Sequence, residues 1–346
     1  MVPAEGLVVG VDTHMDVHVA AVLDRLGRRL GVRSFAAADS GNAQMTRWLD
    51  SLGTVTDAGV EGTGSYGYRL ARALTRHGIQ VREINCPDRS RRRRRGKSDP
   101  VDAENAARAV LAGEATAVPK DRRGAIGELR LLVITRRSAV KARTQASNQI
   151  KAFLLDADDE LRARLRLLHK ARFARACAAL DPGDGLNRAL ASLGRRWLAL
   201  EQEARELEKQ IIALVTAQAP ALLDRHGVGG ITAAQLLVTA GANPGRLRCD
   251  AALAALCGAS PIEASSGKTS RHRLNRGGDR AASNALWTIA HIRMISDPRT
   301  RAYVAKRTAT GNSRKEIMRM LQRYIARELY SLIIDAFVPV TAEVLT

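Results

Sequence analysis

The hydrophobic positions of the first hundred residues form short runs with β-strand spacing, separated by amphipathic stretches. The runs LVVGVD (7–12) and VHVAAVLD (17–24), and a third run that reaches Phe35, are joined by short turns and predict an antiparallel meander. The pattern that follows predicts a helix, a strand ending at Glu61, a second helix, a strand at QVREIN and a helix after Pro100. This order predicts an α/β fold with a mixed sheet flanked by helices.

Between about residues 122 and 219 the hydrophobic period lengthens to that of long helices. Alternating steps of four and three residues predict a coiled-coil seam formed by Leu186, Leu190, Leu193, Trp197, Leu200, Ala204, Leu207, Ile211 and Leu214. An earlier helix keeps the same spacing from Ile126 to Leu154, but polar residues interrupt its middle. We expect these helices to pair with each other or with another subunit. An ordinary helical hairpin and a dimer-forming coil remain equal alternatives.

These patterns together predict an α/β domain followed by all-α regions. The expected division is an α/β domain at 1–121, a helical coiled-coil region at 122–219 and a mainly α-helical C-terminal domain at 220–346.

Composition excludes several classes of protein. Of the residues, 45% are hydrophobic, but no apolar run approaches the roughly 20 residues that cross a bilayer, so no membrane partner is expected. The start, MVPAEGLVVGVD, lacks the basic region and cleavage site of a signal peptide, and we expect a cytoplasmic protein. The cysteines, Cys86, Cys177, Cys249 and Cys257, lie too far apart to indicate a disulfide framework or a zinc site, so we expect small buried hydrophobic residues.

The balance of charge identifies the class of partner. There are 55 Lys and Arg against 35 Asp and Glu, a net charge of +20, which favours a polyanion, and nucleic acid is the leading candidate. Aromatic residues make up only 3% of the chain. We therefore expect contacts to phosphate to dominate over stacking on bases.

Basic residues gather in segments that we expect to contact phosphate. The first is the run Arg91, Arg92, Arg93, Arg94 and Arg95, followed by Lys97. A helix face between 120 and 151 adds to it, and the stretch SSGKTSRHRLNRGGDR (265–280) contributes Lys268, Arg271, Arg273 and Arg276. A Gly-rich turn offers the backbone N–H of Gly229 as a further phosphate ligand, with helix capping as the alternative.

Two aspartates begin the helix in KSDPVDAENAARAV. Pro100 suits the first helical position, which would make Asp99 the N-cap and Asp102 the third helical residue. If the meander begins a ribonuclease-H-like sheet, Asp12 and Glu61 end neighbouring strands at its centre, and this helix packs across them. Four carboxylates in one place repel each other unless divalent cations intervene, and oxygen ligands favour Mg²⁺. The four acids therefore predict a Mg²⁺ site of Asp12, Glu61, Asp99 and Asp102, and this role is compatible with helix capping, because the helix dipole also favours ionised Asp99 and Asp102.

Motifs along almost the whole chain resemble one family. In order, they are VGVDTHMDVHVAAVLD, VEGTGSY, KSDPVDAENAARAV, HGVGGITAAQLL, LCGASPIEASSGK and NRGGDRAASNALW. They resemble the motifs of the bacterial insertion-sequence one-ten family of DEDD transposases. The resemblance implies a RuvC-like N-terminal domain whose catalytic acids are Asp12, Glu61, Asp99 and Asp102. It also implies a C-terminal transposase domain with a catalytic serine at Ser266, beside Ser265.

The resemblance also implies partners. A structured guide RNA from the element pairs with donor and target DNA, and the coiled coil assembles a homo-oligomer, either a dimer or a tetramer. One departure concerns the residues after Asp12, where the family often has Ser-Lys and this chain has Thr13 and His14. We expect His14 to be a strand residue, with metal ligation as the alternative.

Three other functions stay open. A site-specific DNA invertase of the same fold would share the carboxylates and the serine. A nuclease similar to Holliday-junction resolvases would use metal and water and would leave the SSG motif without a task. A basic RNA-binding protein would use the acids only as helix caps.

Overall fold

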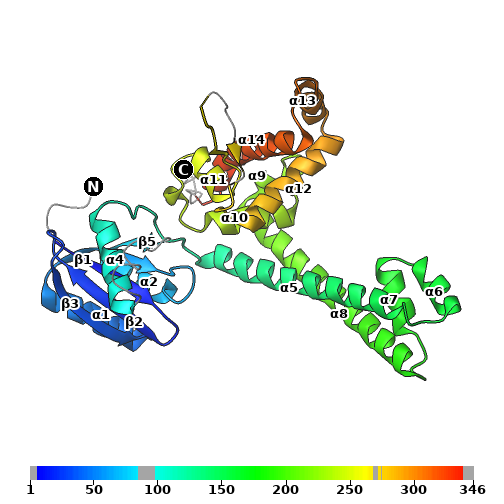
Figure 1. The fold of residues 1–346 in the computed structure, drawn as a ribbon, viewed down its shortest axis with the longest axis horizontal. Helices are drawn as coiled ribbons and strands as arrows, with labels where there is room; N and C mark the ends of the chain where they lie inside the picture. The colour runs from blue at the N-terminus through cyan, green and yellow to red at the C-terminus, as the bar shows by residue number, and fades with distance from the viewer. Residues whose placement is uncertain (1–5, 85–97, 268–271, 274, 338–346) are drawn as a thin grey trace, which may run out of the picture. The chain divides into compact units, whose positions relative to one another are not determined.

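The computed structural model describes residues 6–84, 98–267, 272–273 and 275–337. The chain divides into two compact units, Met1–Asp121 and Arg122–Thr346, and each is described by itself (Figure 1). Among the described residues, no helix combines the length and the apolar character that crossing a membrane requires.

The N-terminal unit contains a five-stranded sheet in the order β3-β2-β1-β4-β5. β1 pairs antiparallel with β2, which pairs antiparallel with β3, whereas β4 runs parallel to both β1 and β5. The strands are β1 (Leu7–Thr13), β2 (Val17–Leu23), β3 (Arg29–Ala36), β4 (Val55–Glu61) and β5 (Gln80–Ile84). This arrangement confirms the predicted mixed sheet and its three-stranded meander.

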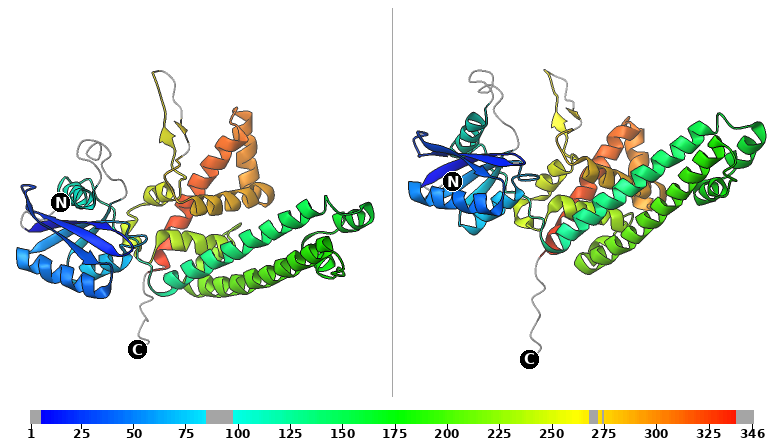
Figure 2. Two further views of the ribbon diagram at one scale, coloured as in Figure 1. Left: turned by 60° about the horizontal axis from the view of Figure 1, so that its bottom comes forward. Right: turned by 90° about the horizontal axis from the view of Figure 1, so that it is seen from below.

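Helices cover both faces of this sheet. Helices α1 (Asp39–Leu52) and α2 (Tyr68–Arg76) pack on the face that presents Val9, Val11 and Val60, and α4 (Asp99–Leu111) packs on the opposite face (Figure 2). The two faces alternate along each strand because successive side chains of a strand point to opposite sides. The residues next to Val9 and Val11 therefore face α4.

Helix α4 lies unusually close to the strands beneath it. A Cβ atom added at Gly10 would overlap the backbone of Ala103 and Ala107, and one added at Gly59 would overlap the carbonyl oxygen of Ala106. Small residues are therefore needed on both sides of the contact. This contact fixes the height of α4 above the ends of β1 and β4.

We predict that Gly10→Ala destabilises the N-terminal unit by about 1–3 kcal/mol, because the added methyl group overpacks a rigid backbone contact. Chemical denaturation followed by circular dichroism measures the effect. Gly183→Ala is the matched control, since a Cβ at Gly183 meets nothing within 4 Å. Equal stability of the two variants would show that α4 can move away from the sheet without cost.

The start of α4 differs by one residue from the prediction. Ser98 is the N-cap, with extended backbone angles (φ −151°, ψ 148°), and its carbonyl accepts hydrogen bonds from the N–H groups of Val101 and Asp102, both at 3.0 Å. Asp99 is therefore the first helical residue and Asp102 the fourth. The prediction that Asp99 is the N-cap was wrong because the backbone of Ser98 already begins the hydrogen-bonded turn.

The second unit is built from helices, and its only strands among the described residues form one short hairpin. Two long helices, α5 (Gly124–Phe153) and α8 (Gly185–Gln218), pack along each other, with α6 (Asp159–Arg166) and α7 (Lys170–Ala178) near one end of the pair (Figure 2). The remaining elements are α9 (Pro220–Leu223), α10 (Gly230–Ala240), the 3₁₀ helix η1 (Pro244–Arg246), α11 (Asp250–Leu256), β6 (Ile262–Glu263), β7 (His272–Arg273), α12 (Arg280–Ser296), α13 (Pro298–Ala309) and α14 (Arg314–Asp335).

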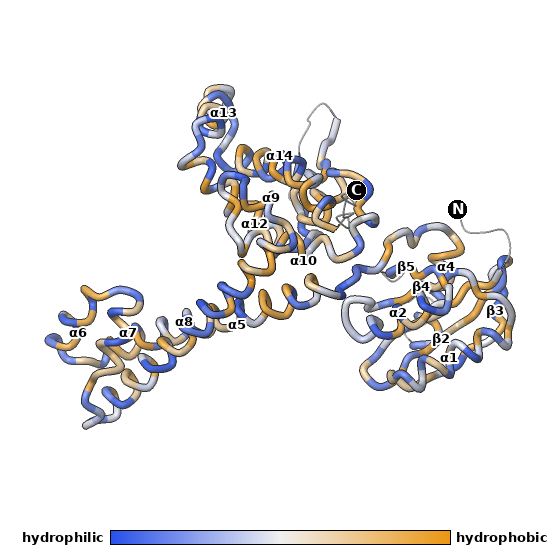
Figure 3. The backbone as a smooth tube through the Cα atoms, turned by 180° about the vertical axis from the view of Figure 1, so that it is seen from behind, coloured by the Kyte–Doolittle hydropathy of each residue, from blue (hydrophilic) through white to orange (hydrophobic). Residues whose placement is uncertain are grey.

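The long helices share a core with the C-terminal helices. Ile126, Leu129 and Val133 of α5 and Ile211 and Val215 of α8 belong to the same buried cluster as residues of α10, α12 and α14. Figure 3 shows hydrophobic residues concentrated in α10 and α12, whereas α13, which buries only Thr300, is mainly hydrophilic. The helical region expected at 122–219 and the domain expected at 220–346 thus share one buried core within the second unit.

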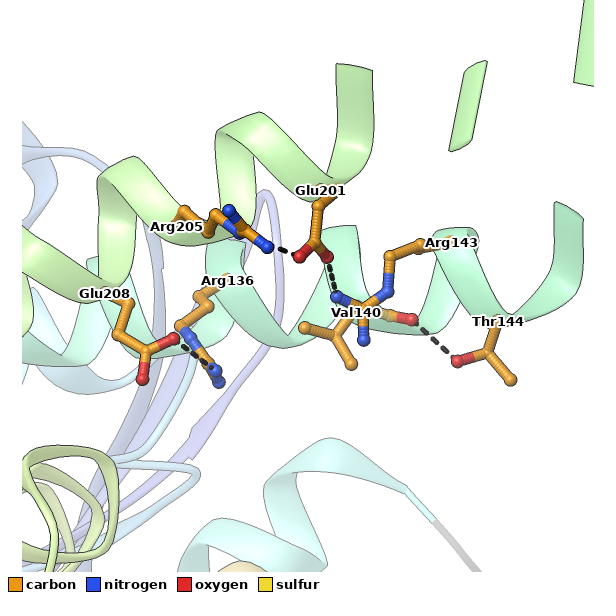
Figure 4. Close-up of polar contacts among 7 residues, drawn as sticks. All are labelled: Arg136, Val140, Arg143, Thr144, Glu201, Arg205 and Glu208. Atoms are coloured by element: carbon orange, nitrogen blue, oxygen red, sulfur yellow. Dashed lines mark hydrogen bonds and ion pairs between the residues drawn. The ribbon is translucent and has the colours of Figure 1, made fainter. Parts of the chain in front are cut away.

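Ion pairs explain the polar interruption that the sequence shows in α5. Arg136 pairs with Glu208 of α8 at 2.9 Å, and Arg143 pairs with Glu201, which also accepts from Arg205 at 2.8 Å (Figure 4). The Arg143 guanidinium also lies over the Trp197 ring, 5.6 Å from its centroid. The polar positions of α5 are thus matched by acids on α8, which specifies how the two helices pair.

The network makes stability depend on pH in a defined direction. Burial opposes ionisation of Glu201, but hydrogen bonds and charges from Arg143 and Arg205 outweigh it and lower the pKa of this carboxyl below 4.5. A lowered pKa gives stability that is complete above the ordinary pKa and is lost as pH falls through the lowered pKa.

We therefore predict that Glu201→Gln costs about 1–2 kcal/mol at pH 7, and that the difference from wild type shrinks below about pH 4.5. Urea denaturation at a series of pH values measures both. The exposed Glu203 on the same helix supplies the control variant Glu203→Gln. A pH-independent difference would mean that packing, and not charge, accounts for the loss.

The expectation of buried cysteines holds for two of them. Cys177 and Cys257 are buried, and burial raises the pKa of their thiols to about 11 and about 12; the charge of Asp279 adds to the shift at Cys257. Cys249 is exposed, so the expectation was wrong there, because this residue precedes the first turn of α11 at the surface. Cys86 lies outside the described residues.

Candidate functional site

The ends of β1 and β4 bring two acids to one face of the sheet. Val11 and Val60 are paired in register and belong to the core beneath α1 and α2, so the next residues, Asp12 and Glu61, occupy neighbouring positions on the α4 face. The Thr13 hydroxyl donates to the Glu61 carbonyl at 2.9 Å and ties the two strand ends together. The predicted placement of Asp12 beside Glu61 thus agrees with the strand register.

The first turn of α4 adds two further acids. Asp12 is 7% exposed and Asp102 is 1% exposed, whereas Asp99 lies at the surface. Burial raises the pKa of Asp12; the nearby His14 opposes this rise, and the charges of Asp99 and Asp102 add to it. Both aspartates of α4 are therefore close enough to act on Asp12 electrostatically.

His14 is the residue that sequence reasoning undervalued. Its Nε2 lies 3.1 Å from Asp12 Oδ2 and 3.5 Å from Asp99 Oδ1. One ligand atom from each of Asp12, His14 and Asp99 falls within 4.8 Å of the others. The signal was present in the sequence, because positions 12 and 14 share a face in extended chain. His14 was expected to be a strand residue, but β1 ends at Thr13 and His14 begins the turn into β2.

The donor set fits a divalent cation. Two carboxylates and one imidazole supply hard oxygen ligands and one nitrogen ligand, and Asp102 and Glu61 are further oxygen donors on the same face of the sheet. A cation at this place would offset the repulsion that Asp99 and Asp102 exert on Asp12. Glu104, another buried acid of α4, is instead neutralised by Arg108 at 2.7 Å and Arg29 at 3.3 Å, which indicates a structural role.

The expected nucleophile and phosphate ligands belong to other segments. Ser266 is an exposed residue after β6 in the second unit, and Arg273 on β7 and Arg276 are also exposed. Gly229 caps α10, and its N–H donates to the Thr232 hydroxyl at 3.0 Å, so phosphate binding there would require this hydrogen bond to break. Arg91, Arg92, Arg93, Arg94, Arg95, Lys97, Lys268 and Arg271 lie outside the described residues.

Comparison with known proteins identifies the family. A family model described as a transposase, of the DEDD type of IS110, matches residues 9–157, and one described as the transposase IS116/IS110/IS902 family matches residues 219–305. The insertion element IS110 uncharacterized 43.6 kDa protein of Streptomyces coelicolor is 35% identical over 159 residues, which cover 44% of this chain and 39% of that protein. The chain belongs to the IS110 family of transposases. The chain spans well under half the length of the Streptomyces coelicolor protein.

The two matched ranges of this IS110 family member divide the candidate residues. The first range contains Asp12, His14, Glu61, Asp99 and Asp102, and the second contains Gly229 and Ser266. The acids that share one face of the sheet therefore lie in the DEDD region of the family, and the serine lies in its C-terminal region.

We predict that Asp12→Asn and His14→Ala each weaken binding of Mn²⁺, used as a spectroscopic probe, by about 10- to 100-fold or more, because each removes a ligand atom. Paramagnetic resonance of free Mn²⁺ measures the loss. His77→Ala is the matched control, since His77 pairs with Asp50 at 2.8 Å elsewhere in the same unit. Wild-type affinity in His14→Ala would exclude the imidazole as a ligand and leave a site of oxygen atoms alone.

Proposed function

We propose that this chain is the transposase of an insertion sequence, which cuts DNA and rejoins it in the cytoplasm. The observation that carries the proposal is the approach of Asp12, His14 and Asp99 at the end of the central strand β1, on the side of the sheet where Asp102 and Glu61 also lie. Family membership supports DNA as the substrate, and the net charge of +20 supports a polyanionic partner.

We further infer a ribonuclease-H-like, RuvC-like fold for the N-terminal unit. The support is the strand order β3-β2-β1-β4-β5, with an antiparallel meander followed by two parallel strands. In this arrangement the acids of β1 and β4 stand at the centre of the sheet, and α4 supplies the others. The prediction of four catalytic acids rests on this placement.

The carboxylates would hold Mg²⁺, with His14 as a further ligand. A bound divalent cation polarises a phosphodiester and stabilises the entering and leaving oxygens. Asp12 and Asp102, both buried, would fix the position of the cation, because their side chains cannot move without disturbing the packing of α4. Asp99, at the surface, would face the incoming strand.

Ser266 would be the nucleophile that conserves phosphodiester energy. Its oxygen forms a bond to phosphorus, the bond from phosphorus to the leaving sugar oxygen breaks, and the hydroxyl proton passes to that oxygen. Attack by the free sugar hydroxyl on the phosphoserine reverses the step and rejoins the strand. The exposure of Ser266 in the hairpin region supports this role, since a buried hydroxyl could not meet DNA.

The guide RNA and the oligomer are further parts of the proposal. The basic segments at 91–97 and 265–280 would bind a structured RNA and the donor and target DNA. The α5–α8 pair would assemble a dimer or tetramer as a coiled coil. Its support is the heptad spacing of α8 alone. The seam residues Leu190, Trp197 and Ile211 are already buried within one chain, so a second chain would meet other faces of the pair.

We predict that Ser266→Ala abolishes strand joining and leaves DNA binding intact. Cleaved DNA is trapped, the protein is digested, and mass spectrometry locates a phosphoserine adduct. The control Ser265→Ala should keep the adduct at Ser266, whereas an adduct at Ser265 in wild type would move the assignment by one residue. Asp12→Asn should also stop cleavage. Free DNA ends and full activity in Ser266→Ala would favour a metal-and-water nuclease instead.

A further inference from the structure

A basic groove lies between α12 and α14 of the second unit. It has a volume of about 1140 Å³ and opens beside the segment that connects the β6–β7 hairpin to α12. Its walls carry basic side chains and the aromatic rings of Trp287 and His291. We call this cavity the α12–α14 groove.

The charged side chains that line the α12–α14 groove are all positive. Arg276, Arg280, Arg314, Lys315 and Arg319 line it, and no acid does among the described residues. Within the described part of the chain, none of these five lies within ion-pair distance of a carboxylate, although the charge of Arg319 acts on Glu316 of the same helix. By contrast, Arg323 and Arg327, further along α14, are neutralised by Asp250 at 2.9 and 3.4 Å. Cations that are held in no ion pair are the ones most available to an anionic ligand.

An aromatic pair gives the groove a second chemical character. The Trp287 side chain is 45% exposed, and its ring is stacked on His291, with the ring centroids 5.0 Å apart and the planes inclined by 9°. Exposure of the large apolar Trp287 ring to water is unfavourable in free energy. A planar ligand that covered the ring would remove this penalty. The His291 ring stacks on the indole, and this contact favours the observed orientation of the Trp287 ring.

We propose that the α12–α14 groove binds a single-stranded segment of nucleic acid, with phosphates on the five cations and one unpaired base against the Trp287 indole. A base within a duplex has both faces covered by its neighbours, so only an unpaired base can meet the ring. The inference deepens the proposed function, because a recombinase guided by RNA has to hold unpaired strands. The biological role of this binding rests on the proposed function. The class of ligand is inferred from the residues of the groove alone.

The test measures binding without cleavage. Fluorescence anisotropy of labelled eight-nucleotide oligomers is recorded with the full-length protein in EDTA, using oligo-dT, oligo-U, an abasic DNA strand and a DNA duplex. Trp287→Leu should weaken binding of oligo-dT or oligo-U by about 5- to 100-fold, as expected for the loss of one stacked base. The abasic strand should bind wild type weakly and lose nothing further in Trp287→Leu, because it has phosphates but no base.

Matched variants separate the groove from general basicity. Tyr324 is 48% exposed on α14 and does not line the groove, so Tyr324→Leu should bind as wild type does. Arg280→Gln combined with Arg314→Gln should lower the salt dependence of binding, whereas Arg299→Gln combined with Arg301→Gln on α13 removes two exposed cations outside the groove and should lower it less. Circular dichroism confirms that each variant is folded.

Each outcome decides the matter. Tighter binding of oligo-dT identifies DNA as the bound strand, and tighter binding of oligo-U identifies RNA. Equal binding of the abasic strand and oligo-dT, or unchanged binding by Trp287→Leu, overturns the proposal. A protein that joins DNA and yet shows no effect at Trp287 would keep the proposed function and lose the groove. A protein that does not cut DNA but binds oligomers through Trp287 would support the groove and contradict the proposed function.

Discussion

The close approach of α4 to the sheet is the contact on which the candidate metal site depends. Gly10 and Gly59 present bare backbone where the helix crosses, and alanines face them from α4. Because no side chain separates the two layers, the first turn of α4 reaches the ends of β1 and β4. The same contact holds the buried Asp102 near the buried Asp12, so repulsion between carboxylates is built into the fold and packing has to offset it. A bound cation would replace the repulsion between these carboxylates with attraction of each carboxylate to the cation.

Most of the fold could be predicted because the hydrophobic period follows the burial of each element. The strands of the N-terminal unit have apolar runs bounded by turn residues, and their order follows from short connections. The start of α4 was displaced by one residue because the backbone of Ser98, and not the side chain of Asp99, begins the turn. The helix pair was visible as a heptad pattern, but its polar positions acquired meaning only when Glu201 and Glu208 were found opposite Arg143 and Arg136. Sequence spacing shows which face is buried and leaves the partner across the interface undetermined.

The candidate site was predictable where spacing alone defines it and not where a turn defines it. Asp12 and Glu61 follow from two parallel strands that end side by side. The two-residue spacing from Asp12 was a signal for His14, but the approach of His14 to Asp99 depends on the turn after β1 and on the position of α4, which a strand pattern does not describe. Composition is limited in a different way. The low aromatic content still favours phosphate contacts overall, but an average over the chain does not reveal a single exposed indole such as Trp287 beside a basic groove.

The acidic cluster around Asp12 and the excess of basic residues have different roles in the proposed reaction. A phosphodiester brought to Asp12 and Asp99 meets like charge, at a cost of about 4 kcal/mol per pair at 4 Å if the effective dielectric constant is about 20. Basic surfaces elsewhere cannot cancel this cost, because salt screens charge beyond about 8 Å under physiological conditions. They instead set the affinity and the rate with which a polyanion is captured. A divalent cation held by the carboxylates would make the last few ångströms of approach favourable, so the negative cluster and the net charge of +20 would have complementary roles.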